Sequence, residues 1–385
     1  MADYGINEVC MFTKVTFIFC LVLWGGMLVV GEPVHTVYVG TYTGPKSKGI
    51  YAFNFDSGTG MASEARLVAE CINPSFLAMH PSGNILYAVN ETGRFNDKDK
   101  NGGVSAFAID STTNYLRIIS RVPSGGTYPC HLTVDKHGKI LVVANYGDGV
   151  VAYFSLNSDG SINNELHQIK HVGSGPNKVR QEGPHAHFVG FDPSQKYLFT
   201  CDLGIDRVLA YAYDEGSGLL STNEVIVGEL PAGSGPRHLA FDFSGRYIFV
   251  INELSNTISC LEWQVAVKKM NLINTVRTLP EDFVGTSTTA EILIHPSGKF
   301  LYGSNRGHNS IVVMRLNGTL LSPIQFESSG GKTPRHFTTD PGGKYLLVAN
   351  QDSDNIVIFK VDHEKGTLTR LGEIRVGSPV CLLFK

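Results

Sequence analysis

The sequence is poor in charge and has no cluster of basic residues. Lysine and arginine total 32 against 35 aspartates and glutamates, so the formal net charge is −3 in a chain of 385 residues. A nucleic-acid-binding surface needs a basic patch or stripe, and the sequence shows none. We therefore expect no nucleic-acid partner, and we expect any anionic ligand to be held by local arginines rather than by the field of the whole protein.

Cysteine and tryptophan are also scarce. Two of the seven cysteines lie near the N-terminus, and the other five are widely spaced without a CxxC pair. This spacing argues against a disulfide framework and against a cysteine zinc site, and we expect neither a metal nor another cofactor. Of the two tryptophans, Trp24 lies near the N-terminus and Trp263 ends an apolar run, so no aromatic platform for a glycan is evident.

A long, almost wholly apolar stretch occurs only near the N-terminus. Lys14 precedes an uncharged run over residues 15–30, and Gly31 follows it. The pattern predicts a secretory signal peptide over residues 1–31, cleaved near Gly31. The alternatives are an uncleaved membrane anchor and a true start at Met11. A real signal predicts a secreted or extracytoplasmic protein without stable membrane insertion, and otherwise the protein would be cytoplasmic. If the chain is exported, the sequons at Asn90 and Asn317 could carry glycans.

An internal repeat with a period of roughly fifty residues organises the rest of the chain. Each copy has two apolar runs joined by a tight turn, and the second run ends in Asn or Asp. Apolar runs of this length between turn residues, without an amphipathic helix, predict β-strands. The six complete copies are 73–91, 128–146, 185–203, 235–253, 288–306 and 333–351.

The two ends of the chain supply the halves of a seventh copy. Residues 35–42 match the second strand of a copy, and residues 378–385 match the first strand. Joining them closes a ring and removes exposed sheet edges. We therefore predict an all-β fold, a seven-bladed β-propeller formed by residues 32–385 as a single domain, with the ring closed in one blade shared by the N- and C-terminal strands. An open solenoid is the alternative.

The predicted hairpins bring polar residues to one mouth of the central channel. Residues equidistant from a hairpin turn lie side by side, so Arg237 and Glu253 are expected to meet about Gly245. The first strand of each blade lines the channel, and equivalent residues of all blades converge. The converging set is His187 with His185 beside it, Arg237, Glu253, Arg306 and Arg335, with Tyr42, Ser75 and Glu91 on a less charged side.

The sequence also allows predictions for residues close to this polar set. The same hairpin rule pairs Ala290 with Arg306. The histidines that follow inward positions are expected to alternate away from the channel and to hydrogen-bond between blades; they are His131, His238 and His336. The non-repeating segment 173–183 is expected to overhang the channel as a polar flap. A purely structural interpretation also exists for Arg237 and Glu253, as an ion pair that ties a hairpin end.

From about His35 to Lys385 the chain resembles the seven-bladed propeller lactonases of the bacterial 6-phosphogluconolactonase type, a family related to a fungal carboxymuconate-lactonizing enzyme. The matching motifs are VYVGTYT, GPHAHFVGFDP, GPRHLAFDFSGRYIFVINE, NRGHNSIVV and PRHFTTDPGGKYLLVANQ. The resemblance implies a site formed by the histidine of PHxH, the arginine of GPRH, the glutamate of NE and the arginine of NRGHNSI. In this chain these residues are His187, Arg237, Glu253 and Arg306.

The resemblance implies hydrolysis of a sugar lactone, with 6-phosphogluconolactone as the expected substrate and a small anionic lactone as the expected ligand. We expect Glu253 or His187 to act as general base. Arg237 would stabilise the oxyanion and keep Glu253 ionised. Arg306 and Arg335, with His185 nearby, would bind a phosphate or carboxylate. A real export signal would favour an unphosphorylated lactone.

Two other function classes remain open from the sequence. The first is an intramolecular lyase of the carboxymuconate-lactonizing type, in which the same arginines hold carboxylates. The second is a secreted binding propeller without catalysis, because the fold alone does not determine function. The sequence leaves the oligomeric state undetermined.

Overall fold

The computed structural model describes residues 1–2, 33–95 and 100–385. Residues 33–385 form one compact unit. The predicted signal peptide falls on residues that lie outside the described part, apart from the first two. No helix within the described residues is long and apolar enough to cross a membrane.

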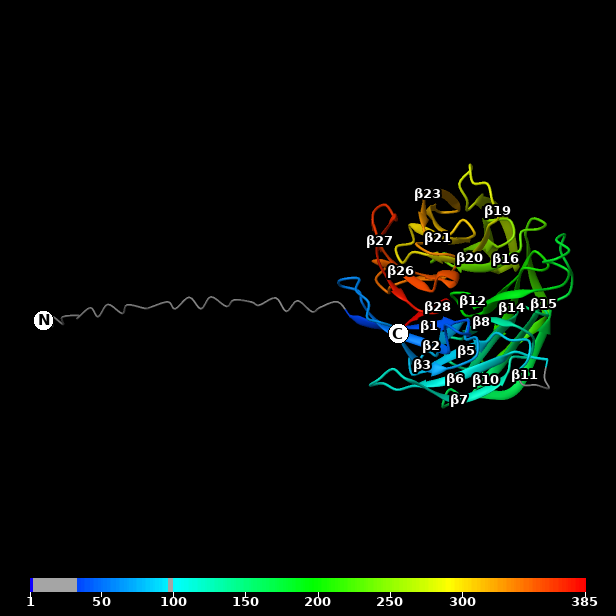
Figure 1. The fold of residues 1–385 in the computed structure, drawn as a ribbon, viewed down its shortest axis with the longest axis horizontal. Helices are drawn as coiled ribbons and strands as arrows, with labels where there is room; N and C mark the ends of the chain where they lie inside the picture. Colours follow the sequence, from blue (N-terminus) through cyan, green and yellow to red (C-terminus); the bar gives the residue numbers. More distant parts are fainter. Residues whose placement is uncertain (3–32, 96–99) are drawn as a thin grey trace. The chain divides into compact units, whose positions relative to one another are not determined.

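Seven antiparallel sheets of four strands each make up the unit, and they are arranged as blades around a ring (Figure 1). Blade 1 comprises β4 (Leu77–Met79), β5 (Ile85–Asn90), β6 (Gly103–Ile109) and β7 (Leu116–Pro123). Blade 2 comprises β8 (Pro129–Val134), β9 (Ile140–Asn145), β10 (Val150–Leu156) and β11 (Ile162–Lys170). Blade 3 comprises β12 (Ala186–Phe191), β13 (Tyr197–Asp202), β14 (Arg207–Asp214) and β15 (Leu219–Glu229).

The second half of the ring repeats this order. Blade 4 comprises β16 (Pro236–Phe241), β17 (Tyr247–Asn252), β18 (Thr257–Gln264) and β19 (Lys269–Arg277). Blade 5 comprises β20 (Thr288–Ile294), β21 (Phe300–Arg306), β22 (Ser310–Asn317) and β23 (Leu320–Ser328). Blade 6 comprises β24 (Pro334–Thr339), β25 (Tyr345–Asn350), β26 (Asn355–Val361) and β27 (Leu368–Arg375). Within the described residues, the only helical segments are the 3-10 turns η1 (Val265–Val267) and η2 (Gln351–Ser353).

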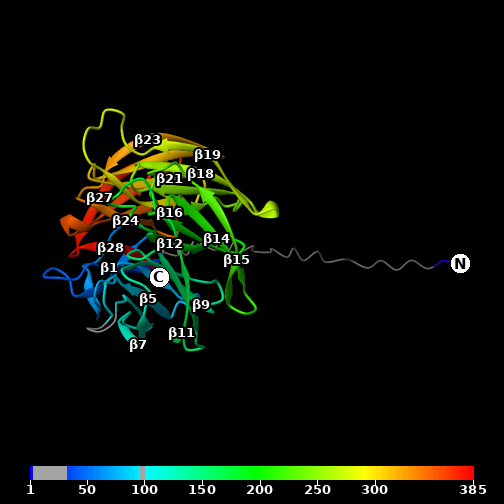
Figure 2. The same ribbon diagram turned by 90° about the vertical axis from the view of Figure 1, so that its right-hand side faces the viewer.

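Blade 7 joins the two ends of the chain. It comprises β28 (Pro379–Phe384), β1 (Val34–Thr41), β2 (Gly49–Asp56) and β3 (Arg66–Glu70). β1 pairs antiparallel with β28, and Val39 lies opposite Leu382. Both views show the blue β1 beside the red β28 (Figures 1 and 2). The structure thus confirms the predicted seven-bladed propeller and its closure by one shared blade.

The hydrophobic core is divided among the seven interfaces between neighbouring blades. One cluster joins Tyr87 and Val89 of blade 1 to Leu132 and Val143 of blade 2, and equivalent clusters fill the other six interfaces. Because both faces of a blade are covered, β9 is buried along its whole length. This two-sided burial explains why the middle strands read as continuous apolar runs rather than as an alternation of apolar and polar residues.

Turn glycines fix the register of the inner hairpins. Gly245 occupies the left-handed region with a φ of 69°, where a side chain is strained. Its amide donates to the carbonyl of Asp242 and closes the turn. Gln195 replaces glycine at the equivalent position of blade 3 with a φ of 58°. These turns align the ends of the inner strands at the channel mouth.

The asparagine that ends the second strand ties neighbouring blades together. In blade 5, Nδ2 of Asn305 donates to the carbonyl oxygen of Thr278 at 2.9 Å, at the end of the outer strand of blade 4. In blade 1, Nδ2 of Asn90 donates in the same way to Ile72 at 2.8 Å. Asn90 is 1% exposed, so its sequon is not available for glycosylation in the folded protein. Asn317, at the end of β22, is exposed.

Candidate active site at the channel mouth

A β-bulge near the start of the inner strand aims a side chain at the channel in most blades. The register of blade 4 shifts between Pro236 and His238, which leaves Arg237 as the extra residue. A bulge places two residues of one strand opposite one residue of its partner and re-aims the side chain. The residues set in this way in the other blades are Cys130, His187, Ala290 with Glu291, and Arg335. The sequence repeat places His187, Arg237 and Arg335 at the mouth but gives no sign of the bulges.

The bulges also change the expected hairpin pairs. The side chains of Arg237 and Glu253 meet at the end of their hairpin, with Nε of Arg237 3.2 Å from Oε2 of Glu253. In blade 5 the register shift spans two residues, so Arg306 lies opposite Thr288. The predicted pairing of Arg306 with Ala290 is therefore wrong. Nη2 of Arg306 instead donates to the carbonyl oxygen of Thr289 at 2.8 Å.

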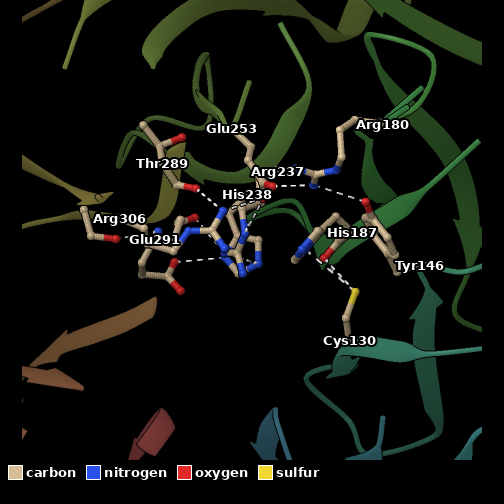
Figure 3. Close-up of polar contacts among 12 residues, drawn as sticks. Cys130, Tyr146, Arg180, His187, Arg237, His238, Glu253, Thr289, Glu291 and Arg306 are labelled. Atoms are coloured by element: carbon tan, nitrogen blue, oxygen red, sulfur yellow. Dashed lines mark hydrogen bonds and ion pairs between the residues drawn. The ribbon is translucent and has the colours of Figure 1, made fainter. Parts of the chain in front are cut away.

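Glu253 is the centre of an arginine cluster (Figure 3). Its Oε2 lies 2.8 Å from Nη2 of Arg306 and 3.2 Å from Nε of Arg237. Its Oε1 accepts a hydrogen bond of 2.6 Å from Nη2 of Arg180. The Glu253 side chain is 5% exposed. A single carboxylate therefore holds three guanidinium groups together at the mouth.

The electrostatics of this cluster keep Glu253 ionised. Burial alone would raise the pKa of Glu253, but Arg306, Arg237 and Arg180 together lower it to about 2. Burial and the neighbouring Arg306 and Arg335 lower the pKa of Arg237 to about 10. Both groups are therefore charged near neutral pH. Nη1 of Arg237 also donates to the carbonyl oxygen of Ala290 at 2.7 Å, which fixes the guanidinium in the channel.

Arg180 is a site residue that the sequence analysis missed. It lies in the connection between β11 and β12, within the segment predicted to overhang the channel. Its Nη2 donates to Glu253 and, at 3.2 Å, to the hydroxyl of Tyr146. The buried Gln181 fastens the segment because its Nε2 donates to Oδ1 of Asp206 at 2.7 Å. Only the position of this segment beside the PHxH motif could have indicated Arg180, because it belongs to no repeat.

The two histidines of the PHxH motif lie in different surroundings. His187 is 5% exposed, and its Nδ1 is 3.7 Å from the sulfur of Cys130. Burial and the nearby Arg237 lower the pKa of His187 well below its usual value, so the ring is neutral. His185 stacks on Tyr146 with a centroid distance of 4.5 Å, and its Nδ1 bonds to the carbonyl oxygen of Tyr146 at 2.7 Å.

The remaining predicted arginine lies on the other side of the mouth. The guanidinium of Arg335 lies over the ring of Tyr42, 5.2 Å from its centroid. Within residues 33–95 and 100–385, no hydrogen bond or ion pair of Arg335 is found. The hydroxyl of Tyr42 donates to Oε2 of Glu91 at 2.8 Å, and Ser75 donates to the same oxygen. Arg335 is thus the arginine of the mouth that forms neither a hydrogen bond nor an ion pair with another described residue.

Below the arginine cluster, side chains from several blades form a layer across the channel. The rings of His131 and His238 lie 5.0 Å apart, and Phe76 lies within 6.1 Å of both and of His336. Rings from blades 1, 2, 4 and 6 can meet only on the common axis, so the prediction that these histidines point away from the channel is wrong. The bulges turn two successive residues inward. The histidines do bond between blades, as His238 to Glu291 of blade 5.

The contacts of His238 determine which of its ring nitrogens carries the proton. Nη1 of Arg237 lies 3.3 Å from Nε2 of His238, and Nδ1 of His238 lies 3.0 Å from Oε1 of Glu291. Because an arginine only donates, Nε2 accepts and Nδ1 carries the proton. Burial and Arg237 lower the pKa of His238 well below its usual value, so the ring is neutral. Glu291 thereby supports Arg237 through His238.

Beyond the layer, the channel widens on the side of the hairpin turns. A cavity of about 560 Å³ lies there, lined among others by Phe76, Thr133, Gly190, Glu291 and Thr338. Within the described residues, no group of three or more His, Cys, Asp or Glu side chains has the arrangement of a metal site.

Comparison with known proteins shows where the chain belongs. The family described as "Lactonase, 7-bladed beta-propeller" matches residues 36–384. A 6-phosphogluconolactonase of Bacillus subtilis is 35% identical over 350 residues, covering 90% of this chain and 97% of the relative. A 6-phosphogluconolactonase of Formosa agariphila is 36% identical over 341 residues, covering 87% and 95%. The structure of a periplasmic gluconolactonase of Pseudomonas aeruginosa superposes with a TM-score of 0.84 at 31% identity, covering 91% and 99%. The chain therefore belongs to the seven-bladed β-propeller lactonase family.

Proposed function

We propose that the protein hydrolyses a small sugar lactone at the channel mouth, with 6-phosphogluconolactone as its substrate. The names of the relatives from Bacillus subtilis and Formosa agariphila support this reaction. The observation that carries the proposal is the excess of guanidinium groups over carboxylates at one mouth. Within the described residues, Arg180, Arg237 and Arg306 share ion pairs with Glu253 alone, and Arg335 forms none.

The arginines have different parts in the proposed reaction. Arg237 is held rigidly by Ala290 and Glu253, so it can stabilise the negative charge that develops on the carbonyl oxygen without reorganising. Arg306 bonds to Glu253 and to Thr289, and its role is to support that charge. Arg335 has free donors beside Tyr42, and a guanidinium binds phosphate or carboxylate oxygens in pairs. It is the arginine that would hold the phosphate.

The assignments of Glu253 and His187 as general base stay predictions. Glu253 is a weak base because three arginines lower its pKa to about 2, and a general base works best with a pKa near the operating pH. His187 is neutral but surrounded by arginine charges that oppose its protonation. We propose that the main task of Glu253 is to hold the three guanidinium groups together. His185 lies beside Tyr146 at the rim and would contact a bound sugar.

An assay of acid release with and without the 6-phosphate tests the proposal. We expect turnover of both gluconolactones above the uncatalysed rate, with a kcat/KM at least tenfold higher for the phosphorylated lactone. Equal values of kcat/KM, or a preference for the unphosphorylated lactone, would instead favour a gluconolactonase activity, the activity named for the periplasmic relative of Pseudomonas aeruginosa. Conversion of a carboxymuconolactone alone would favour the lyase, and absence of any turnover would favour a binding propeller.

A further inference from the structure

Hydrolysis of a lactone needs a group that removes a proton from the attacking water, and Glu253 and His187 are poorly suited to this step. Both oxygens of Glu253 are occupied by arginines, through contacts of 2.6, 2.8 and 3.2 Å. The His187 ring is buried beside Cys130, and protonation would place a positive charge next to Arg237. The other carboxylate of the mouth is that of Glu91.

Glu91 has the surroundings that Glu253 lacks. It follows β5 of blade 1 and is half-buried. Its Oε2 accepts hydrogen bonds from the hydroxyls of Tyr42 and Ser75, which are neutral donors. Within residues 33–95 and 100–385, no basic side chain forms an ion pair with Glu91, and no hydrogen bond reaches its Oε1. One carboxylate oxygen is thus fixed and the other is free.

The main chain holds Glu91 rigidly in this position. Its amide donates to the carbonyl oxygen of Asn73 at 3.0 Å, and its own carbonyl accepts a hydrogen bond of 3.1 Å from Nδ2 of Asn73. Oδ1 of Asn73 in turn accepts hydrogen bonds of 2.9 Å from the amide and from the hydroxyl of Thr43. Tyr42 and Glu91, which come from blades 7 and 1, are therefore locked to each other through one asparagine.

Glu91 is connected to Arg335 through Tyr42. Tyr42, which donates to Glu91, forms the ring under Arg335. The charges of Glu91 and of Glu253 both act on Arg335 and on the thiol of Cys130. Cys130 in turn lies against His187. A lactone whose phosphate is bound at Arg335 and whose carbonyl faces Arg237 would have Glu91 at its open side.

We propose that Glu91 is the general base of the reaction and that Tyr42 and Ser75 position its carboxylate. This assignment rests on the proposed lactone hydrolysis. Oε1 of Glu91 takes a proton from water as the water oxygen bonds to the lactone carbonyl carbon, and the carbonyl electron pair moves to the oxygen facing Arg237. When the tetrahedral intermediate collapses, the bond from this carbon to the ring oxygen breaks. Glu91 returns its proton to that oxygen, and the acid product ionises into solvent.

The test compares Glu91→Gln with Glu253→Gln and His187→Asn in the acid-release assay, after subtraction of the uncatalysed rate. Positioned general bases contribute about 100-fold or more to rate. We expect Glu91→Gln to lower kcat at least 100-fold with KM within threefold of wild type, and to remove the acid limb of the pH profile of kcat. Glu64→Gln, at an exposed carboxylate on the outer side of blade 7, is the matched control and should retain full activity.

Two further measurements keep the assignment falsifiable if Glu91→Gln folds poorly. Formate should raise the kcat of Glu91→Ala at least tenfold, because it supplies the missing carboxylate. Tyr42→Phe and Ser75→Ala should lower kcat with KM within threefold of wild type, because each removes a hydrogen bond that positions the Glu91 carboxylate. A purely structural role of these hydroxyls would lower the melting temperature and leave kcat unchanged.

The outcomes separate the two proposals. Turnover by the wild type with kcat of Glu91→Gln within threefold would overturn the assignment of Glu91 and leave lactone hydrolysis intact. In that case, loss of the acid limb in Glu253→Gln or His187→Asn would identify the base. Absence of lactone turnover in the wild type would reject the proposed function and the assignment together.

Discussion

Nη2 of Arg180 lies 2.6 Å from Oε1 of Glu253, although the residues are 73 positions apart in the chain. Arg180 comes from the connection between blades 2 and 3, and Glu253 follows the second strand of blade 4. The ion pair therefore fastens the connecting segment over the mouth, while Tyr146 adds a second contact to the same guanidinium nitrogen. The Arg180 side chain is 37% exposed and the Glu253 side chain 5%. Arg180 is therefore the partly solvent-exposed partner of a buried carboxylate.

Loss of Arg180 should impair catalysis more than folding. We expect Arg180→Ala to lower kcat/KM for the phosphorylated lactone by about 10- to 100-fold, because it removes a charge and loosens the segment at the mouth. The melting temperature should change little, because the guanidinium is partly exposed. Lys178→Ala, at an exposed lysine of the same segment, serves as the control. Equal effects of the two substitutions on kcat/KM would argue against a specific role of Arg180.

Neutralising Glu253 should reduce stability as well as activity. In Glu253→Gln three guanidinium groups remain close together without their counter-charge, and breaking a buried ion network of this kind costs roughly 3–5 kcal/mol. We expect a clear drop in the urea midpoint. Glu262→Gln breaks the pair with Arg246, whose side chain is 62% exposed, and should leave the urea midpoint close to that of the wild type. Undiminished stability and turnover of Glu253→Gln would contradict the role given to this carboxylate.

Arg335 should decide the preference for a phosphorylated substrate. Arg335→Met keeps much of the side-chain volume over Tyr42 but removes the free donors. We expect kcat/KM for the phosphorylated lactone to fall at least 30-fold and that for the unphosphorylated lactone to fall less than threefold. Steady-state kinetics with both lactones checks this expectation. A parallel loss for both substrates would instead place Arg335 at the reacting carbonyl.

The histidine layer predicts loss of stability in mild acid. Burial, together with neighbouring charges, lowers the pKa of His131, His187 and His238 well below 6.5 and that of His336 to about 4. These rings are neutral when folded but take up protons below 6.5 when unfolded, so stability is full above pH 6.5 and falls as the pH drops toward 4. Each pKa unit corresponds to about 1.4 kcal/mol. Burial raises the pKa values of Glu291 and Asp148, and these two carboxyl groups act in the opposite direction but are outnumbered by the four histidines.

Urea unfolding at several pH values between 7 and 4 measures this effect. The free energy of unfolding should decline steadily over the window in the wild type and less steeply in His336→Gln. His363→Gln, at an exposed histidine, is the control and should keep the wild-type slope. A wild-type free energy that stayed constant between pH 6.5 and 4 would show that the buried rings titrate normally.

The sequence by itself determined the number of blades, the closure of the ring and the strands that bear the site residues. The repeat fixes these features because each blade needs its own turn and its own apolar strands, as the positive φ of Gly245 illustrates. The middle strands of the blades are buried on both faces, so their apolar pattern stands out. The contact between Arg237 and Glu253 could be predicted from the sequence, because the two residues are equally distant from the turn of one hairpin.

Only the tertiary structure decided how side chains from separate blades engage each other. The bulges that turn His238 inward leave no mark in the apolar pattern, because a one-residue insertion changes direction without changing residue type. Arg180 belongs to no repeat, and its contact with Glu253 depends on where a long connection lies in space. Glu91 likewise forms no ion pair with the arginines that surround Glu253, because blades 1 and 4 lie at different positions around the ring. The linear sequence does not give these positions.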